Sequence, residues 1–306
     1  MSSSRRWSRA EGVTTTVETA APRSARWRRA GPPYSLLLPG GLWLLVFFVV
    51  PMVSMLSVSL QEGSLEQGYE LTWRFQTYLD VLGKFDTQFI RSIFYGLMVT
   101  GALLLICYPL AYTIAFRGGR WKNVLLFLLI MPFFVSFIIR TLEWKFILAD
   151  DGFIFGTLKN LGLVGEDFRV LATPFAVIGG LVYNFLPFMA LPLYVALERM
   201  DRSLLDAAGD LYSSRTSAFL RVTLPLSLPG VFAGSLLTFI PAVGDFINAE
   251  ILGGINTTMI GNVIQNEFLV SNDYPEAAAI SFLLLAGILI GVAVYAKLLG
   301  TEELTG

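Results

Sequence analysis

The chain has 306 residues, of which 55% are apolar and only 15% are charged, with a formal net charge of −1 and a mean hydropathy of +0.65. A soluble domain usually carries about 25% charged residues, so the composition predicts an integral membrane protein. The chain contains no histidine and a single cysteine, Cys107. These counts exclude an internal disulfide and effectively exclude a Cys/His metal site, and we expect Cys107 to be a small packing residue within an apolar span.

Six runs without Asp, Glu, Lys or Arg follow one another along the chain. Each is long enough, or nearly so, to cross a hydrocarbon core of ~30 Å as a helix of about 20 residues. The runs are 30–61, 92–116, 123–139, 170–197, 222–244 and 277–296. The third is the shortest, so we expect its span to include a few flanking residues. A seventh run, 251–265, is short and contains Gly, Asn and Thr, which predicts a re-entrant or surface segment. The pattern predicts an all-α polytopic membrane protein with six transmembrane helices.

Prolines recur inside these runs. They are Pro51, Pro109, Pro132, Pro187, Pro192 and Pro241. Neighbouring helices and small polar side chains can satisfy the carbonyls that a proline leaves free in a membrane helix. Kinked spans suit a protein that changes shape, and they are equally consistent with ordinary membrane-helix prolines.

Basic residues are unevenly distributed between alternate loops. With a cytoplasmic N-terminus, fifteen Lys and Arg residues lie inside and seven outside, whereas eight acids lie inside and fifteen outside. Because Lys and Arg resist translocation, this asymmetry predicts that both termini are cytoplasmic. We therefore expect a disordered basic cytoplasmic tail at 1–34, a six-span domain at 35–299 and a short cytoplasmic tail at 300–306.

The loop between the fourth and fifth spans, 198–225, contains a predicted pair of short helices. Asp201 can cap the N-terminus of the first helix, and Leu204, Ala207, Ala208 and Leu211 follow at i, i+3, i+4 and i+7. That spacing places one apolar stripe on the helix. The small side chains of the two alanines allow another surface to approach this stripe closely. Such a surface could dock into a groove of a partner protein.

A second short helix is expected after a cap at Ser213 and Ser214, ending before Leu224-Pro225. The whole loop resembles the EAA loop of ABC importer permeases, in which E-A-A is followed by a glycine and later by a hydrophobic-x-L-P sequence. Asp206-Ala207-Ala208 matches with Asp in place of Glu, and Tyr212 replaces the glycine of the turn. By this resemblance the ATPase-coupling residues are Asp206, Ala207, Ala208, Leu211, Tyr212, Leu224 and Pro225.

The resemblance extends over about residues 35–299: the chain is similar to the permeases of spermidine/putrescine-type importers, and of their two permeases it most resembles the first (the B-type subunit). The segments that carry it are 140–144, 180–188, 191–194, 253–254 and 259–264. It implies the type I ABC importer permease (MetI-like) fold and a multi-pass location in the inner or plasma membrane of a prokaryote. The polyamine part of this assignment rests on motifs that permeases for other small solutes partly share.

The resemblance also implies partners. Two permeases form one pathway, two cytoplasmic ATPase subunits dock on their EAA loops, and an extracytoplasmic binding protein delivers the substrate. The chain has no G-x-x-x-x-G-K-[ST] motif, so we expect ATP and Mg²⁺ to bind the partner ATPases and not this chain. We expect no catalytic residue, no metal site, no cofactor in this chain and no nucleic-acid partner.

A polyamine is a flexible polycation, so its pathway should offer carboxylates and aromatic faces. Asp245 and Glu250 follow the fifth span, and Tyr183 and Asn184 lie within the fourth. We regard these four as pathway candidates. Alternatively, the acids are solvated loop residues, and the Tyr and Asn only form hydrogen bonds between helices.

Two other classes of function fit less well. An ion-coupled secondary transporter would normally carry ionisable residues at mid-membrane, and the six runs contain none. An intramembrane enzyme would need an acid, a base or metal ligands, which the spans do not supply.

Overall fold

The computed structural model describes residues 32–165, 167–210 and 214–298. Its α-helices are α1 (Pro32–Leu44), α2 (Val50–Ser59), α3 (Gln76–Lys84), α4 (Asp86–Arg117), α5 (Lys122–Ile130), α6 (Phe137–Leu148), α7 (Phe153–Asn160), α8 (Pro174–Glu198), α9 (Arg202–Asp210), α10 (Arg215–Ala218), α11 (Leu224–Val243), α12 (Ile247–Leu252), α13 (Ile260–Leu269) and α14 (Tyr274–Leu298). Shorter π- or 3₁₀-helical turns are η2 (Leu45–Val49), η3 (Gly119–Trp121), η4 (Met131–Phe134), η5 (Phe219–Thr223) and η6 (Ile255–Thr257). Most of the expected tail at 1–34, and all of 300–306, lie outside the described residues.

The predicted helical architecture is confirmed. Within the described residues, five helices are long and apolar enough to cross a membrane, or six if a bent pair counts as one span. The five are Leu37–Ser59, Asp86–Arg117, Pro174–Glu198, Thr216–Val243 and Tyr274–Lys297. Between the first two, β1 (Gln61–Ser64) and β2 (Gly68–Leu71) form an antiparallel hairpin in which Glu62 pairs with Glu70, an element that the sequence patterns did not predict.

The third span differs from the expected helix over 123–139. The structure has two helical segments here, Gly119–Phe134 and Phe137–Asn160, and they are bent by 93° relative to each other. Val135 and Ser136 have extended ψ values of about 139° and 138°. Pro132 precedes the turn and lacks the N–H that would continue the α-helical hydrogen bonds. The charge-free run therefore contains the end of one helix and the start of another.

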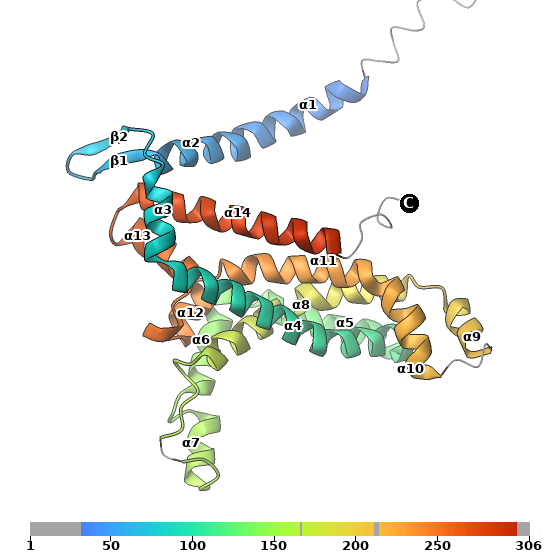
Figure 1. The fold of residues 1–306 in the computed structure, drawn as a ribbon. Helices are drawn as coiled ribbons and strands as arrows, with labels where there is room; N and C mark the ends of the chain where they lie inside the picture. Colours follow the sequence, from blue (N-terminus) through green and yellow to red (C-terminus); the bar gives the residue numbers. More distant parts are fainter. Residues whose placement is uncertain (1–31, 166, 211–213, 299–306) are drawn as a thin grey trace, which may run out of the picture. The chain divides into compact units, whose positions relative to one another are not determined.

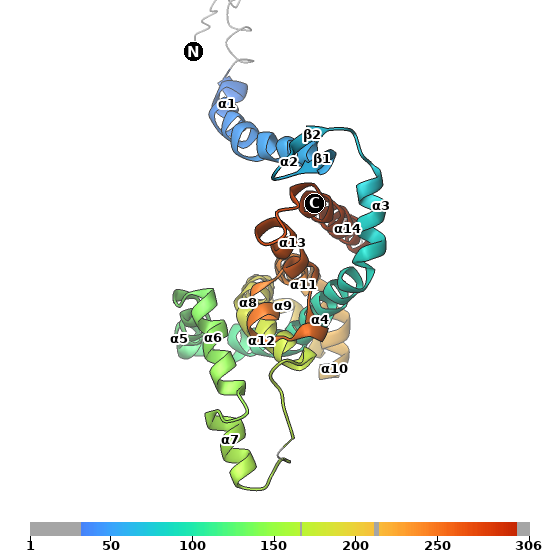
Figure 2. The same ribbon diagram turned by 90° about the vertical axis from the view of Figure 1, so that its left-hand side faces the viewer.

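The chain divides into two units, residues 1–54 and 55–306. The described part of the first unit is α1, η2 and the start of α2. The second unit contains the remaining elements, and its centre is formed by α4, α8 and α11, each of which packs on the other two (Figure 1). Figure 2 shows α5, α6 and α7 to one side of α8.

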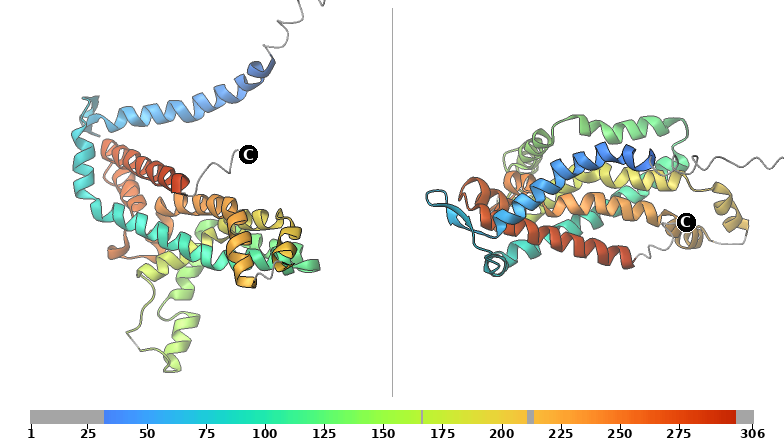
Figure 3. Two further views of the ribbon diagram at one scale, coloured as in Figure 1. Left: turned by 45° about the vertical axis from the view of Figure 1, so that its right-hand side comes forward. Right: turned by 90° about the horizontal axis from the view of Figure 1, so that it is seen from above.

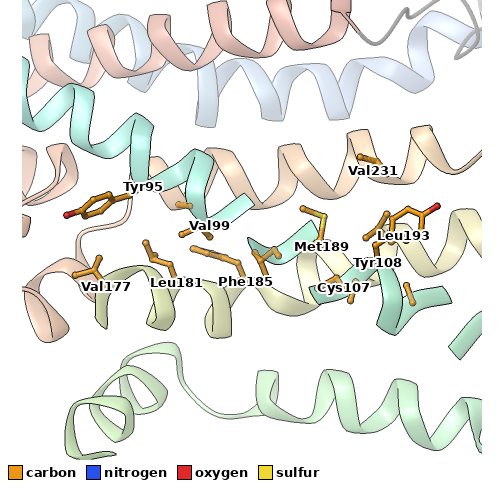
Figure 4. Packing of buried hydrophobic residues seen from close by; sticks show 14 of the residues in the cluster. Tyr95, Val99, Cys107, Tyr108, Val177, Leu181, Phe185, Met189, Leu193 and Val231 are labelled. Carbon is orange, nitrogen blue, oxygen red and sulfur yellow. The ribbon is translucent and has the colours of Figure 1, made fainter. Parts of the chain in front are cut away.

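The hydrophobic core lies where α4, α8 and α11 meet (Figure 4). Cys107 of α4 is fully buried there beside Leu193 and Met189 of α8, as expected for a small packing residue. A second buried cluster joins α3, α13 and α14 through Val81, Ile260 and Ile280. The start of α13 is therefore packed inside the second unit, so residues 260–263 of the seventh run are not a surface segment.

Candidate functional site

The loop after α8 contains the two predicted helix starts, those of α9 and α10. The Ser203 N–H donates to Asp201 Oδ1 at 2.9 Å, and the Ser217 N–H donates to Ser214 Oγ at 3.1 Å. Both side chains thus accept a backbone N–H that the first turn of a helix leaves unpaired. The predicted caps at Asp201 and Ser214 are confirmed.

The second short helix does not end before Leu224-Pro225 as expected. It continues from α10 through the π-helical turn η5 into α11, so that Thr216–Val243 is one helix. The Leu224 N–H donates to the Phe219 carbonyl, five residues back. A π-helical turn adds one residue immediately before Pro225, which has no N–H to donate. Leu224 packs against the core, whereas Pro225 is exposed.

The apolar residues of α9 do not all face the same way. Ala208 is only 8% exposed, and α9 contacts α10 and η5 of its own chain. Leu204 is 45% exposed, and Ala207 and Asp206 are also exposed. The surface that α9 offers to a partner is therefore centred on Leu204 and Ala207. The other two predicted coupling residues, Leu211 and Tyr212, lie outside the described residues.

Two basic segments of the chain lie at one end of the second unit. Lys122 at the start of α5 forms an ion pair with Glu198 at the end of α8. This contact places segment 117–122 beside the loop that carries α9 and α10. In the right-hand view of Figure 3, α9 and α10 lie at the opposite end of the helices from α3 and α13. The two segments therefore lie at the same end of the second unit.

Two of the four pathway candidates, Asp245 and Asn184, meet in a buried polar cluster. Asn184 Nδ2 donates to Thr141 Oγ1 at 3.0 Å and to Asn248 Oδ1 at 3.1 Å. Asn248 in turn donates to Asp245, from its N–H at 2.8 Å and from Nδ2 at 3.2 Å. Thr141, Asn184 and Asn248 are fully buried, and Asp245 is 8% exposed. The cluster joins α6, α8 and α12 to the end of α11, which is the interhelical role that the alternative gave to Asn184. The alternative for Asp245, a solvated loop residue, is wrong because this carboxylate is buried.

The Asp245 carboxyl group lies just beyond the last residue of α11. Burial raises its pKa from the ordinary 3.8 to about 6, although hydrogen bonds from Asn248 and Ala249 act in the opposite direction. Burial penalises the charged form of an acid, whereas donors stabilise it. Asp245 therefore changes its charge within the physiological pH range.

We predict that this titration makes the folded protein less stable as the pH rises. Because the folded pKa lies above the unfolded one, the stabilising contribution is complete below about pH 4 and is lost as the pH passes about 6. A separation of about two pKa units corresponds to about 3 kcal/mol of unfolding free energy. Thermal unfolding of the solubilised protein between pH 4 and pH 8 measures this loss. Asp245→Asn should flatten that dependence, and an unchanged pH profile in the variant would assign the titration to another group.

Glu250 and Tyr183 do not join this cluster. Glu250 is exposed and accepts a hydrogen bond from Asn262 Nδ2 at 3.2 Å. Glu250 and Asn262 line a polar hollow of about 250 Å³ beside Gly253 and Gly254. Tyr183 is half-buried, and its ring meets that of Trp144 edge-on with centroids 5.4 Å apart. Of the four candidates, Glu250 is thus the accessible carboxylate.

A larger hollow of about 640 Å³ lies between α5, η4, α8 and α11, and its lining is almost entirely apolar. Phe133 and Phe188 contribute aromatic rings whose centroids are 5.0 Å apart, and Arg199 lines it as well. Sequence reasoning did not identify this hollow. The available signal was the recurrence of proline on its two main helices, at Pro187, Pro192 and Pro229, since proline removes a helix hydrogen bond and can bend the helix.

The sequence of the chain is similar to that of one family of transport proteins. Residues 107–298 match the family described as "Binding-protein-dependent transport system inner membrane component". The chain is 37% identical to the spermidine/putrescine transport system permease protein PotB of Haemophilus influenzae, over 78% of this chain and 84% of that protein. It is 36% identical to PotB of Escherichia coli K12, over 79% and 88% of the two chains. It is also 32% identical to the E. coli inner membrane ABC transporter permease protein YdcU, over 70% and 72%.

The fold has solved counterparts. A chain of a bacterial ABC transporter involved in the import of alginate, an acidic polysaccharide, matches with a TM-score of 0.67 and 20% identity, over 89% of this chain and 96% of that one. At this identity the likeness concerns the fold alone, which is that of an ABC importer permease. From the family match, the PotB relatives and the shared fold, we conclude that the chain belongs to the family of inner membrane components of binding-protein-dependent transport systems, as a permease subunit.

Proposed function

We propose that this permease forms half of the pathway of an ATP-driven importer for polyamines such as spermidine and putrescine. The observation that carries the proposal is the 37% identity to a PotB permease over 78% of the chain. The second half of the pathway is a second permease subunit, and an extracytoplasmic binding protein delivers the substrate. Residues 35–299 form the six-span permease domain.

The surface of α9 around Leu204 and Ala207 is the docking site for one of two cytoplasmic ATPase subunits. Two features support this assignment: both side chains are exposed at the tip of a capped loop, and the sequence of the loop resembles the EAA loop. ATP and Mg²⁺ bind those partner subunits, because this chain has no phosphate-binding G-x-x-x-x-G-K-[ST] motif. The chain itself is therefore a transport component and not an enzyme.

The substrate path uses two different surfaces of the second unit. Glu250 offers an accessible carboxylate at the polar hollow, where an ammonium group can be paired. The apolar hollow along α8 offers the rings of Phe133 and Phe188, whose faces can contact the methylene or ammonium groups of a polyamine. Asp245 and Asn184 support this path by holding α6, α8 and α12 together.

A second candidate substrate class is an uncharged small solute. It is favoured by the absence of any carboxylate among the residues lining the apolar hollow in the described part of the chain. Competition experiments that measure uptake of labelled spermidine distinguish the two classes. In a polyamine importer, unlabelled spermidine or putrescine inhibits this uptake, whereas sugars and neutral amino acids do not.

We predict that Glu250→Gln lowers polyamine uptake by about tenfold. A charge beside a partly hydrated path contributes about 1–2 kcal/mol at an effective dielectric near 20, and 1.4 kcal/mol is one decade. The measurement is uptake of labelled spermidine into vesicles that contain the assembled importer, its binding protein and ATP. Glu70→Gln, a like change on the exposed β2 strand, is the matched control and should leave uptake intact. Full uptake by Glu250→Gln would show that Glu250 does not contribute to the substrate path. A lack of spermidine uptake by the unmodified importer would contradict the polyamine assignment.

We predict that both termini are cytoplasmic, with loops 61–91, 140–169 and 245–276 outside. Single cysteines at Ser64, Lys159 and Ser214, introduced in a Cys107→Ala background, can be treated with a membrane-impermeant thiol reagent in intact cells. Positions 64 and 159 should be labelled, and position 214 should react only after the cells are opened. Labelling of position 214 in intact cells would contradict the predicted orientation.

A further inference from the structure

Arg140, in the first turn of α6, is a buried cation without a counter-ion. Only 7% of the residue is exposed, and Nε has no hydrogen-bond partner. No carboxylate of the described residues lies within ion-pair distance of it; the ion pairs there involve Arg74, Lys84, Lys122, Lys159 and Arg169. A buried charge is costly unless another interaction compensates it.

Two aromatic rings lie within cation–π distance of the Arg140 guanidinium. Its guanidinium carbon lies 5.1 Å from the centroid of the Phe133 ring and 5.7 Å from that of Phe137. Both distances are within the ~6 Å over which a cation is attracted to an aromatic face. Phe133 belongs to η4 and Phe137 to α6, on the two sides of the break in the third span. The break therefore assembles the site in which the guanidinium lies.

The same rings belong to an aromatic row that joins the broken span to α8. Phe133 meets Phe188 at 5.0 Å, Phe137 meets Phe185 at 6.1 Å, and Trp144 meets Tyr183 at 5.4 Å. Phe133 and Phe188 also line the apolar hollow of about 640 Å³. The guanidinium thus occupies the faces of aromatic rings that continue into the hollow assigned to the substrate path.

We propose that Arg140 is a tethered competitor for the cationic substrate, which occupies the faces of Phe133 and Phe137 until a substrate ammonium group displaces it. An aromatic face that holds one cation offers less attraction to a second, and two cations at this spacing repel each other in a poorly hydrated site. Arg140 therefore weakens substrate binding in the membrane complex and determines specificity, because a polyamine competes with several ammonium groups and a monovalent amine with one. This inference rests on the proposed polyamine function.

The test measures binding of labelled spermidine to the solubilised importer, with all its membrane and ATPase subunits but without the soluble binding protein. Arg140→Ala is expected to bind spermidine about tenfold more tightly, and Arg140→Lys to remain near the unmodified protein, because an ammonium group also occupies an aromatic face. Arg169→Ala is the matched control: the Arg169 side chain is 73% exposed and is paired with Asp150. Its affinity should not change.

Chemical rescue separates competition from a purely structural role. Millimolar guanidinium chloride should weaken spermidine binding to Arg140→Ala, by refilling the vacated faces, and should not weaken binding to the unmodified importer beyond the effect of an equal concentration of NaCl. Adding Phe133→Leu to Arg140→Ala should return the affinity toward that of the unmodified importer. Arg140→Gln, which preserves more of the side-chain volume, replaces the alanine variant if the latter assembles poorly.

Unchanged or weaker spermidine binding by an assembled Arg140→Ala or Arg140→Gln complex would overturn the proposal, as would the absence of a specific guanidinium effect. Either result leaves the polyamine assignment intact, since that is decided by uptake into vesicles by the unmodified importer with its binding protein. Failure of that uptake, in contrast, removes the substrate on which the competition depends.

Discussion

Replacing Ala207 by glutamate is expected to abolish transport and to release the ATPase subunits, while the helical bundle stays folded. Ala207 is exposed on α9 beside Leu204, so the new carboxylate would point away from its own chain and into the proposed contact. An unpaired charge buried in an interface costs about 3 kcal/mol or more, which corresponds to docking weakened by more than about a hundredfold. Co-purification of the ATPase subunits and vesicle uptake measure the two effects.

Two further variants make this result specific. Ser64→Glu adds the same charge to the exposed strand β1 and should leave both docking and transport unchanged. Ala208→Glu should instead reduce the stability of this chain, because Ala208 is buried within it. Normal co-purification and uptake by Ala207→Glu would show that α9 is not the ATPase contact.

Replacing Gly230 by leucine is expected to push α8 and α11 apart and to destabilise the folded protein strongly. A Cβ atom at position 230 would lie 2.5 Å from Ala196 Cβ and 2.8 Å from the Pro192 carbonyl oxygen. Gly230 and Gly234 form a G-x-x-x-G pair on α11, a spacing that lets membrane helices approach closely. Overpacking costs about 1–3 kcal/mol when the surroundings can yield, and here one obstacle is backbone. We expect a loss of about 3 kcal/mol or more, measured by thermal unfolding of the solubilised protein.

Gly287→Leu is the matched control for this prediction. Gly287 is an exposed position of α14, and a Cβ atom there would meet nothing within 4 Å. Leucine has a higher helix propensity than glycine by up to about 1 kcal/mol, so this variant should be as stable as the unmodified chain or slightly more so. Equal stability of the two leucine variants would mean that α11 and α8 are not held as closely as described.

The sequence alone determined those features that depend on local chemistry. Charge-free runs located five of the expected spans, because partition between lipid and water depends on local hydropathy. Asp201 and Ser214 were recognisable as helix caps, because a cap acts within three residues of itself. The loop at 198–225 also indicated the family, which the comparisons confirm.

Only the tertiary structure decided which faces of the helices pack together. Lipid chains are as apolar as leucine, so hydrophobic periodicity does not separate a buried face of a membrane helix from a lipid-facing one. In the loop outside the spans, Ala208 is buried and Ala207 exposed because α9 packs on α10 and η5, a contact that the spacing of apolar residues does not specify. The packing of α6, α8 and α12 likewise brings Asp245 of one loop to Asn184 of a distant helix through Asn248. These contacts join segments far apart in the chain, and they arise from close packing between whole helices rather than from any local pattern.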